Sequence, residues 1–334
     1  MEKGLGDEVM KRLPVTSPAY QYIEKSFKEW LEALGYSWQA VYYMPIQIRG
    51  LLHYLENNNK HQLTDITTEA ITNYYYQELK QRKNYLHDAG TLSNKHLNKN
   101  IQALRKFTEY LRQTGKLQIP LLNIKQEEII DNKPTVLTEE EIQQLYKATE
   151  VIPDKMKHAK PREFYEMLNL RDKAMLSIFY GCGLRRNEGY HLNTTDIHLE
   201  TAVVHVRKGK GYKERFVPIS KKGVQYITEY LYDARPMLLS PSIGGVGEAA
   251  FFLNHHGKRL GGQMLMLCLQ NLARRTNNTV LQQKEIGLHT LRHSIATHLL
   301  ANGMSLEKIK EFLGHSSLES TQIYTHLINE KYNE

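Results

Sequence analysis

The sequence predicts a mainly α-helical fold, in which a four-helix bundle is followed by an α+β domain with a small antiparallel sheet. A chain of 334 residues is long enough for two domains of ordinary size. Apolar residues recur at three- and four-residue intervals along much of the chain, which is the period of an amphipathic helix. Only one region alternates with the two-residue period of a strand, and a glycine-containing turn divides it.

The bundle is predicted after a short N-terminal extension that has too few residues to fold alone. In the first helix, Tyr22, Phe27 and Leu31 recur at helical spacing and predict a buried face. Gly115 follows the last apolar position of the fourth helix and is a typical helix stop. The extension is assigned to residues 1–18, the bundle to residues 19–115, and its four helices to residues 19–34, 38–55, 67–81 and 93–114.

Residues 116–136 are predicted to link the two domains, because they contain two prolines and no sustained apolar period. The second domain, residues 137–334, opens at Thr138. Glu141 follows three residues later, and this spacing is that of a capping box at a helix start. Further helices are expected at residues 172–180, 224–235, 264–277, 291–301 and 306–312, and a hairpin of two short strands at residues 202–206 and 216–219.

Composition limits the class of protein. The sequence has 44 Lys and Arg residues against 36 Asp and Glu residues, and a net charge of +8 suggests a polyanionic partner without proving one. Two cysteines in a chain of this length argue against a disulfide framework or a cysteine-based zinc site. No apolar run reaches the length of a membrane span, and the acidic start does not resemble a secretory signal. We therefore expect a cytoplasmic protein that does not interact with membranes.

Three segments contain clusters of chemically active side chains, but each alone has an ordinary explanation. The first could be a turn with a surface Arg–Glu pair, and the second could be the charged tip of a hairpin. His289 and His293 have the spacing of a zinc-protease motif, but Thr290 stands where that motif needs glutamate, so we expect no metal site. The segments run from Gly181 to Glu188, from Arg207 to Arg215, and from His289 to His326.

Taken together, the three segments resemble the tyrosine recombinase family, which includes phage integrases and Xer proteins. The family pattern is Gly-Leu-Arg-x-x-Glu, a lysine on a β-hairpin, His-x-x-Arg-His, Leu-Gly-His, and a tyrosine nine residues further on. Order, residue types and spacings all match. The matching residues are Gly183, Leu184, Arg185 and Glu188, then Lys210, then His289, Arg292 and His293, then Leu313, Gly314 and His315, and finally Tyr324.

The resemblance implies a SAM-like core-binding bundle at residues 19–115 and a catalytic domain at residues 137–334. It also implies phosphoryl transfer without metal, ATP or another cofactor. The hydroxyl of Tyr324 attacks a DNA phosphodiester, forms a 3′-phosphotyrosyl bond and frees a 5′-hydroxyl. A 5′-hydroxyl from another strand later reverses this step, so the ester keeps the bond energy.

The resemblance also implies a role for each matching side chain. Arg185 and Arg292 clamp the phosphoryl oxygens, because a guanidinium bonds two oxygens at once and stays charged. His315 donates to the same oxygens, and Lys210 protonates the leaving 5′-oxygen. The remaining assignments are His289 as the base for Tyr324, Glu188 as the residue that orients Arg185, and His293 as a supporting hydrogen-bond partner.

The expected partner is double-stranded DNA. The family implies a homo-tetramer on two DNA sites, a monomer or weak oligomer without DNA, and a cytoplasmic, nucleoid-associated location. Accessory proteins that bend DNA or set direction are compatible with this scheme. The expected task is integration, excision or inversion, with a mobile element as the expected DNA, and the sequence leaves chromosome-dimer resolution open as well. Basic side chains that could contact phosphates are Lys95, Lys99, Arg105, Lys106, Lys208 and Lys213.

Two alternatives remain beside the recombinase. A type IB topoisomerase shares the covalent chemistry but relaxes supercoils as a monomer, and the compact bundle-plus-catalytic layout favours the recombinase. A catalytically idle DNA-binding protein could share the fold. The presence of all six expected side chain types at the active-site positions favours an active enzyme.

Overall fold

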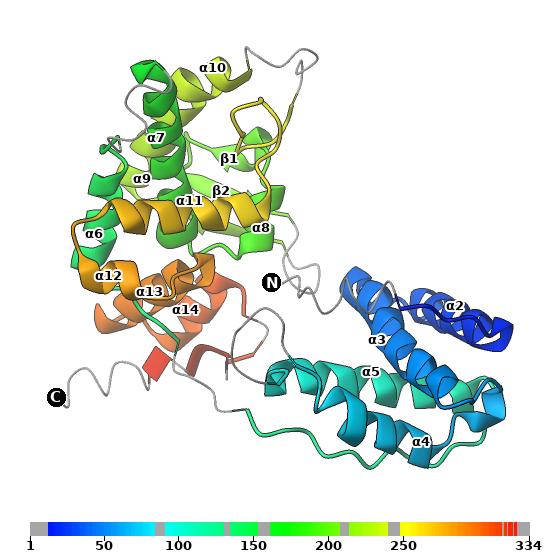
Figure 1. Cartoon of the computed structure of the whole chain (residues 1–334). Coiled ribbons are helices and arrows are strands. Elements are labelled where there is room, and N and C mark those ends of the chain that lie inside the picture. Colours follow the sequence, from blue (N-terminus) through cyan, green and yellow to red (C-terminus); the bar gives the residue numbers. More distant parts are fainter. Residues whose placement is uncertain are drawn as a thin grey trace. The chain divides into compact units, whose positions relative to one another are not determined.

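The computed structural model divides the chain into two compact units, Met1–Asp131 and Asn132–Glu334 (Figure 1). The boundary lies inside the segment predicted as a linker. The described residues are 13–83, 91–129, 134–152, 161–207, 214–239, 248–315, 317–318, 320–322 and 324–325.

The first unit is a helical bundle, and all four predicted helices are present. The third one differs from the expectation, because after six residues it widens into a π-helical turn. Helix α3 packs against both α2 and α5. The elements are α2 (Pro18–Ala33), α3 (Trp38–Asn57), η1 (Leu63–Asp65), α4 (Thr68–Asn73), η2 (Tyr74–Leu79) and α5 (Asn94–Gln113).

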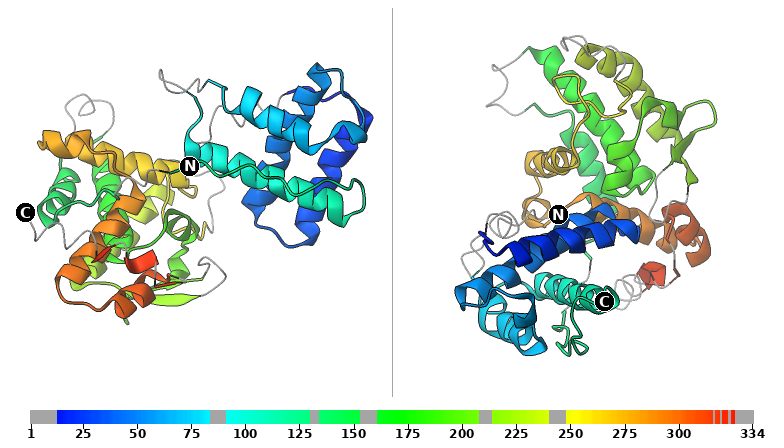
Figure 2. Two further views of the ribbon diagram at one scale, coloured as in Figure 1. Left: turned by 90° about the horizontal axis from the view of Figure 1, so that it is seen from below. Right: turned by 90° about the vertical axis from the view of Figure 1, so that its right-hand side faces the viewer.

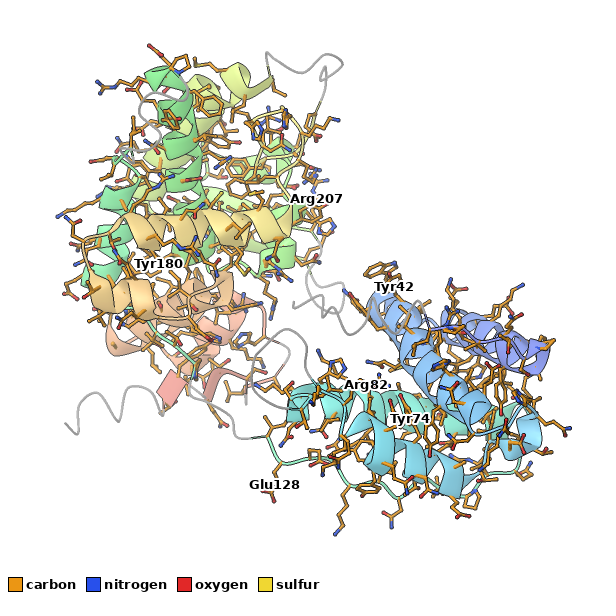
Figure 3. All side chains as sticks on the ribbon, viewed as in Figure 1. Tyr42, Tyr74, Arg82, Glu128, Tyr180 and Arg207 are labelled. Carbon is orange, nitrogen blue, oxygen red and sulfur yellow. The ribbon has the colours of Figure 1, made fainter. Side chains whose placement is uncertain are left out.

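Aromatic side chains fill the centre of this bundle. Phe27 of α2 meets the ring of Phe107 of α5 edge to face, with 5.3 Å between ring centroids. Neither side chain is exposed to solvent, and Leu51 of α3 is equally buried beside them. Burial of such large apolar side chains is the main source of stability for a bundle of this size. Figure 3 shows the side chains on the ribbon.

An extended segment, residues 117–129, lies on the first unit and will be called the strap. Ile119, Leu122 and Ile124 are buried in the bundle core. The strap backbone bonds to side chains of α5, for example through Arg105 Nη2, which donates to the Ile124 carbonyl at 2.7 Å. The sequence predicted only a linker here, because three spaced apolar residues show neither a helical nor a strand period.

The second unit is mainly helical, with one small sheet (Figure 2). Its helices are α6 (Glu139–Ala148), α7 (Arg162–Leu176) with η4 (Ser177–Gly181), α8 (Arg186–His191), η5 (Thr194–Asp196), α9 (Lys221–Glu229) with η6 (Tyr230–Ala234), α10 (Arg235–Leu239), α11 (Gly262–Arg275), α12 (Thr279–Gln283), α13 (Leu288–Ala301) and α14 (Leu306–Leu313). Its strands are β1 (Ile197–His198), β2 (Val203–Val206) and β3 (Arg215–Pro218).

The sheet is antiparallel in the order β1-β2-β3. Val204 pairs with Val217, and Val206 pairs with Arg215. The three valines are buried, so one face of the sheet packs on the core of the unit. The predicted hairpin is therefore present, whereas β1 was missed because two residues are too few to show alternation.

The capping box predicted at the start of the second domain is confirmed. Thr138 Oγ1 accepts a hydrogen bond from the Glu141 amide at 3.2 Å, and Glu141 Oε2 accepts one from the Thr138 amide at 2.9 Å. Lys284 Nζ also donates to Glu141 Oε1 at 2.6 Å. The start of α6 is thus fixed both locally and from a distant part of the unit.

Candidate active site

Arg185 and Glu188 are fixed to each other at the start of α8. The backbone amide of Arg185 donates to Glu188 Oε2 at 2.9 Å, and Arg185 Nη1 donates to Glu188 Oε1 at 2.8 Å. The spacing of three residues makes this possible, because it brings the carboxylate back over the first turn of the helix. The orienting role of Glu188 stays a prediction, and these two contacts are the ones that such a role would need.

Arg292 reaches the same place from α13. Its Nη1 donates to the Gly183 carbonyl at 2.6 Å, and its Nη2 donates to the Leu313 carbonyl at 2.8 Å. Arg185 Nη2 donates to the next carbonyl, that of Gly314, at 3.1 Å. The two predicted clamp residues therefore come together at one turn after α14, although 107 positions separate them in the sequence.

The carbonyls that hold these guanidiniums belong to unusual backbone turns. Gly183 has φ +59° and Gly314 has φ +65°, a left-handed conformation that other L-residues adopt only with strain. A Cβ atom at Gly183 would lie 2.9 Å from Leu313 Cδ2. Glycine is thus strongly favoured at both positions, where any other residue would strain the turns whose backbone oxygens face Arg185 and Arg292.

A third guanidinium, that of Arg215, completes the cluster. Its Nη1 and Nη2 donate to Glu188 Oε1 and Oε2 at 3.0 and 2.9 Å. The sequence interpretation gave Arg215 no role, although it ends the basic segment that includes Lys210. Only the fold shows which carboxylate this arginine reaches.

Burial and charge act together on the cluster. Burial and the positive charge of Arg185 lower the pKa of Arg292 to about 9. Burial acts to raise the pKa of Glu188, but hydrogen bonds and charge from Arg215 outweigh it, so the pKa is lowered. At neutral pH the site therefore holds an ionised carboxylate among three positively charged guanidiniums.

His315 and Tyr324 lie beside the arginine pair. His315 Nδ1 is 2.9 Å from Thr321 Oγ1, and its ring stacks on that of Tyr324 with centroids 6.3 Å apart. Tyr324 is 1% exposed and packs among Ile309 and Leu313. The hydroxyl of Tyr324 is thus held out of solvent close to the predicted phosphate-binding groups.

The hydroxyl of Tyr324 is 3.1 Å from His293 Nδ1. The prediction assigned the proton-accepting role to His289, which lies one helical turn earlier on α13 and is exposed. Because the two histidines share a helix face, the same motif presents both, and the sequence could not show which one meets the tyrosine. In this structure the nearer ring is that of His293.

Burial and nearby positive charge keep the imidazole rings of His315, His293 and His289 neutral. Burial, followed by the charge of Arg292, lowers the pKa of His315 to about 3. Burial and the neighbouring His289 lower the pKa of His293 to about 4. Partial loss of solvent and the charge of Arg292 also lower the pKa of His289. Burial raises the pKa of the Tyr324 phenol, while the charges of Arg292 and Arg185 oppose this rise.

The predicted general acid, Lys210, lies outside the described residues, as do Lys208 and Lys213. The strands on either side of them are described. Arg207, at the end of β2, forms an ion pair with the buried Asp196. This ion pair thus fixes the end of β2, and the contacts of Arg215 fix the start of β3.

The basic residues predicted to contact DNA from the first unit fall into two groups. Arg105 donates to the strap, and Lys106 Nζ binds Glu109 Oε2 at 2.7 Å, so both have partners within the unit itself. Lys95 and Lys99 are exposed on α5. The sequence could not separate the two groups, because it does not show whether a basic side chain on a helix face has a partner within the unit.

Two features are absent from the residues that the structure describes. Within them, no three His, Cys, Asp or Glu side chains gather as a metal site would require. No helix in those parts of the chain combines the length and apolar character that crossing a bilayer demands.

The model of the phage integrase family matches residues 135–331, which cover the whole site described above. The chain belongs to this family, that of the tyrosine recombinases. Tyrosine recombinase XerD of Listeria innocua is 36% identical over 228 residues, which are 68% of this chain and 70% of the relative. Tyrosine recombinase XerD of Oceanobacillus iheyensis is 32% identical over 284 residues, or 84% and 85% of the two chains.

Solved structures show the same tyrosine recombinase fold. The XerH site-specific recombinase, bound to its difH substrate in a pre-cleavage complex, aligns with a TM-score of 0.66 and 21% identity, over 95% of this chain and 84% of its own. A λ integrase dimer bound to a core site aligns with a TM-score of 0.61 and 13% identity, over 91% and 94%. The mainly helical architecture with a small sheet, predicted from the sequence, is thereby confirmed.

Proposed function

We propose that this tyrosine recombinase cuts and rejoins DNA at specific sites through an ester between Tyr324 and a 3′-phosphate. The observation that carries the proposal is the meeting of Arg185, Arg292 and His315 around one turn, with the Tyr324 ring stacked on His315. Two guanidiniums suit the charge that develops on the equatorial phosphoryl oxygens during attack. The freed 5′-hydroxyl is the leaving group, and a 5′-hydroxyl from another strand attacks the ester to reseal the DNA.

Proton transfer completes the scheme. A phenol ordinarily has a pKa near ~10 and must lose its proton to attack. His289 is proposed as the base, because its neutral ring is exposed and can face bound DNA, while His293 holds the hydroxyl before DNA binds. Lys210 is proposed to protonate the leaving 5′-oxygen.

The assembly and the task are further parts of the proposal. Four copies are proposed to act on two double-stranded DNA sites, in the cytoplasm and at the nucleoid. The exchange is integration, excision or inversion, with a mobile element as its DNA. Footprinting on the genomic DNA that neighbours the gene would identify the bound sequence, and analytical ultracentrifugation of the complex would count the subunits.

The nucleophile is tested with a Tyr324→Phe variant and a nicked suicide DNA substrate, which traps the covalent adduct. The wild type should form the adduct, and the variant should form none while binding the same DNA with unchanged affinity. An adduct with the variant would show that another side chain is the nucleophile. A plasmid carrying two sites should be recombined, whereas site-independent relaxation without exchange would indicate a topoisomerase.

A further inference from the structure

Among the cations of the site that the structure describes, Arg215 makes the most side-chain hydrogen bonds, yet no step of the proposed chemistry uses it. All three of its donor nitrogens are bound, with Nη1 and Nη2 on Glu188 and Nε 3.3 Å from the Phe312 carbonyl. Its side chain is only 12% exposed. Three of the five N–H donors of this guanidinium are used inside the protein, two of them on one carboxylate, so we look for its role in the groups that it holds.

The carboxylate of Glu188 is shared by three guanidiniums. Arg185 Nη1 lies 2.8 Å from it, Arg292 Nη1 lies 4.0 Å from it, and Arg215 binds both of its oxygens. The Glu188 side chain is 2% exposed, so solvent cannot screen its charge. Without Arg215, this buried negative charge would be compensated only by the two arginines that are needed for the phosphate.

Arg215 also supports the turn that carries His315. A Cβ atom added to Gly314 would lie 3.0 Å from both Cδ and Nη1 of Arg215, so the arginine packs closely against that residue. The Gly314 carbonyl accepts from Arg185, and His315 follows directly in the chain. Arg215 therefore contacts the supports of two proposed catalytic residues without lying at the reacting group.

We propose that Arg215 is a positioning residue that neutralises Glu188, so that Glu188 can orient Arg185 without cancelling the positive charge that Arg185 and Arg292 present to the DNA phosphate. With Arg215 in place, the four side chains carry two net positive charges, and without it they carry one. The bidentate fork of arginine suits this role better than the single ammonium of lysine. The inference rests on the proposed function, since it assigns Arg185 and Arg292 to the phosphate.

A double-mutant cycle tests the charge balance directly. The variants are Arg215→Met, Glu188→Gln and both together, and the readout is the rate of covalent adduct formation on the suicide DNA. Arg215→Met should slow the reaction about 10²-fold in the wild-type background, the size of effect seen when one stabilising donor is lost. In the Glu188→Gln background it should cost less than about threefold, because the charge that Arg215 neutralises is already gone.

Controls separate this role from simple support of the fold. Arg207→Met removes the ion pair with Asp196 that holds the end of β2, the other strand of the hairpin. Any effect of this substitution on the rate should be equal in both Glu188 backgrounds. Arg215→Lys keeps the charge and should recover part of the lost rate. Arg215→Gln, which is uncharged and polar, takes the place of Arg215→Met in the cycle if Arg215→Met fails to fold, which its thermal unfolding would reveal.

The outcomes are distinct. If Arg215→Met, or Arg215→Gln in its place, slows the reaction by the same factor with Glu188 and with Gln at that position, the neutralising role is refuted and Arg215 only supports the fold. No slowing in either background refutes it as well. Absence of any adduct with the wild type, by contrast, would count against the proposed function itself.

Discussion

Tyr324 has its hydroxyl in a protected place before DNA binds. The side chain is 1% exposed and its hydroxyl meets His293, while the arginines that would hold the phosphate contact backbone carbonyls. Burial raises the phenol's pKa, which disfavours ionisation. The free protein therefore keeps its proposed nucleophile protonated.

Separate substitution of the two histidines tests the proposed base. His289→Ala should slow adduct formation by about 10²-fold or more, because removal of a general base typically costs at least this factor. His293→Ala removes only the resting partner of Tyr324 and should change the rate by less than about tenfold. The measurement is single-turnover cleavage of suicide DNA at saturating protein. A larger loss for His293→Ala would transfer the base role to that residue.

His315 makes stability depend on pH. Its pKa falls from the ordinary 6.5 to about 3 in the folded protein, so the unfolded chain takes up a proton at a higher pH than the folded one. The resulting stability is fully present above about pH 6.5 and is lost as the pH falls toward 3. Between pH 7 and pH 5 the loss should be about 1 kcal/mol, because solvent still reaches the half-buried ring.

A His315→Gln variant provides the comparison. The free energy of unfolding, measured with urea at pH 7 and at pH 5, should fall less for the variant than for the wild type. Equal losses would mean that His315 does not cause the pH dependence. His293 adds a change of the same sign, so the variant keeps part of the slope.

At the scale of single residues, the sequence showed the motif residues and their spacing, but it did not show some of the contacts between their side chains. The spacing of the motifs predicted that Arg185, Arg292 and His315 share one site, and the structure gathers them at one turn. Arg215 escaped notice because its role depends on the Glu188 carboxylate, which lies 27 residues away along the chain. The partner of Tyr324 was equally hidden, because two histidines share one helix face.

Among the elements, the strap on the first unit is stabilised by one carboxylate. Glu127 Oε1 accepts hydrogen bonds from Tyr75 and from Lys80, both at 2.7 Å. The Glu127 backbone also exchanges two hydrogen bonds with the side chain of Asn98. Since charged hydrogen bonds contribute more than neutral ones, this residue should add measurably to the attachment that burial of Ile119, Leu122 and Ile124 provides.

A Glu127→Ala variant should therefore lose about 1–3 kcal/mol of stability, since Tyr75 and Lys80 lose their shared acceptor. The neighbouring Glu128 is exposed, so a Glu128→Ala variant is the matched control and should stay within about 0.5 kcal/mol of the wild type. Urea unfolding followed by circular dichroism measures both. Indistinguishable variants would show that the strap does not depend on this carboxylate.

Several elements with a clear period were predicted nearly to their ends, as with α5, which stops before Gly115 as expected, whereas α7 begins at Arg162 and not at the predicted residue 172. The capping box at Thr138 was equally visible, because it depends on two residues three positions apart. The strap and β1 were not predicted, because their structure comes from tertiary packing rather than from local preference. Part of the segment predicted as a linker therefore belongs to the core of the first unit.

At the scale of the whole molecule, the charge of +8 is the feature that bears on DNA. Affinity for duplex DNA should fall steeply with salt, by about 10³-fold or more between 50 and 200 mM if several phosphates are contacted. Fluorescence anisotropy with a labelled duplex measures this, and a neutral polymer of similar size serves as the control. An affinity that does not respond to salt would be inconsistent with phosphate recognition.

The single carboxylate shared by three arginines has a practical consequence for anyone who wishes to redirect this enzyme. Effects of substitutions at Arg185, Glu188, Arg215 and Arg292 will not add, because each one redistributes the charge felt by the others. Libraries that vary these positions one at a time will therefore find mostly inactive proteins. Productive variants should be sought by changing the acidic residue together with one of its basic neighbours.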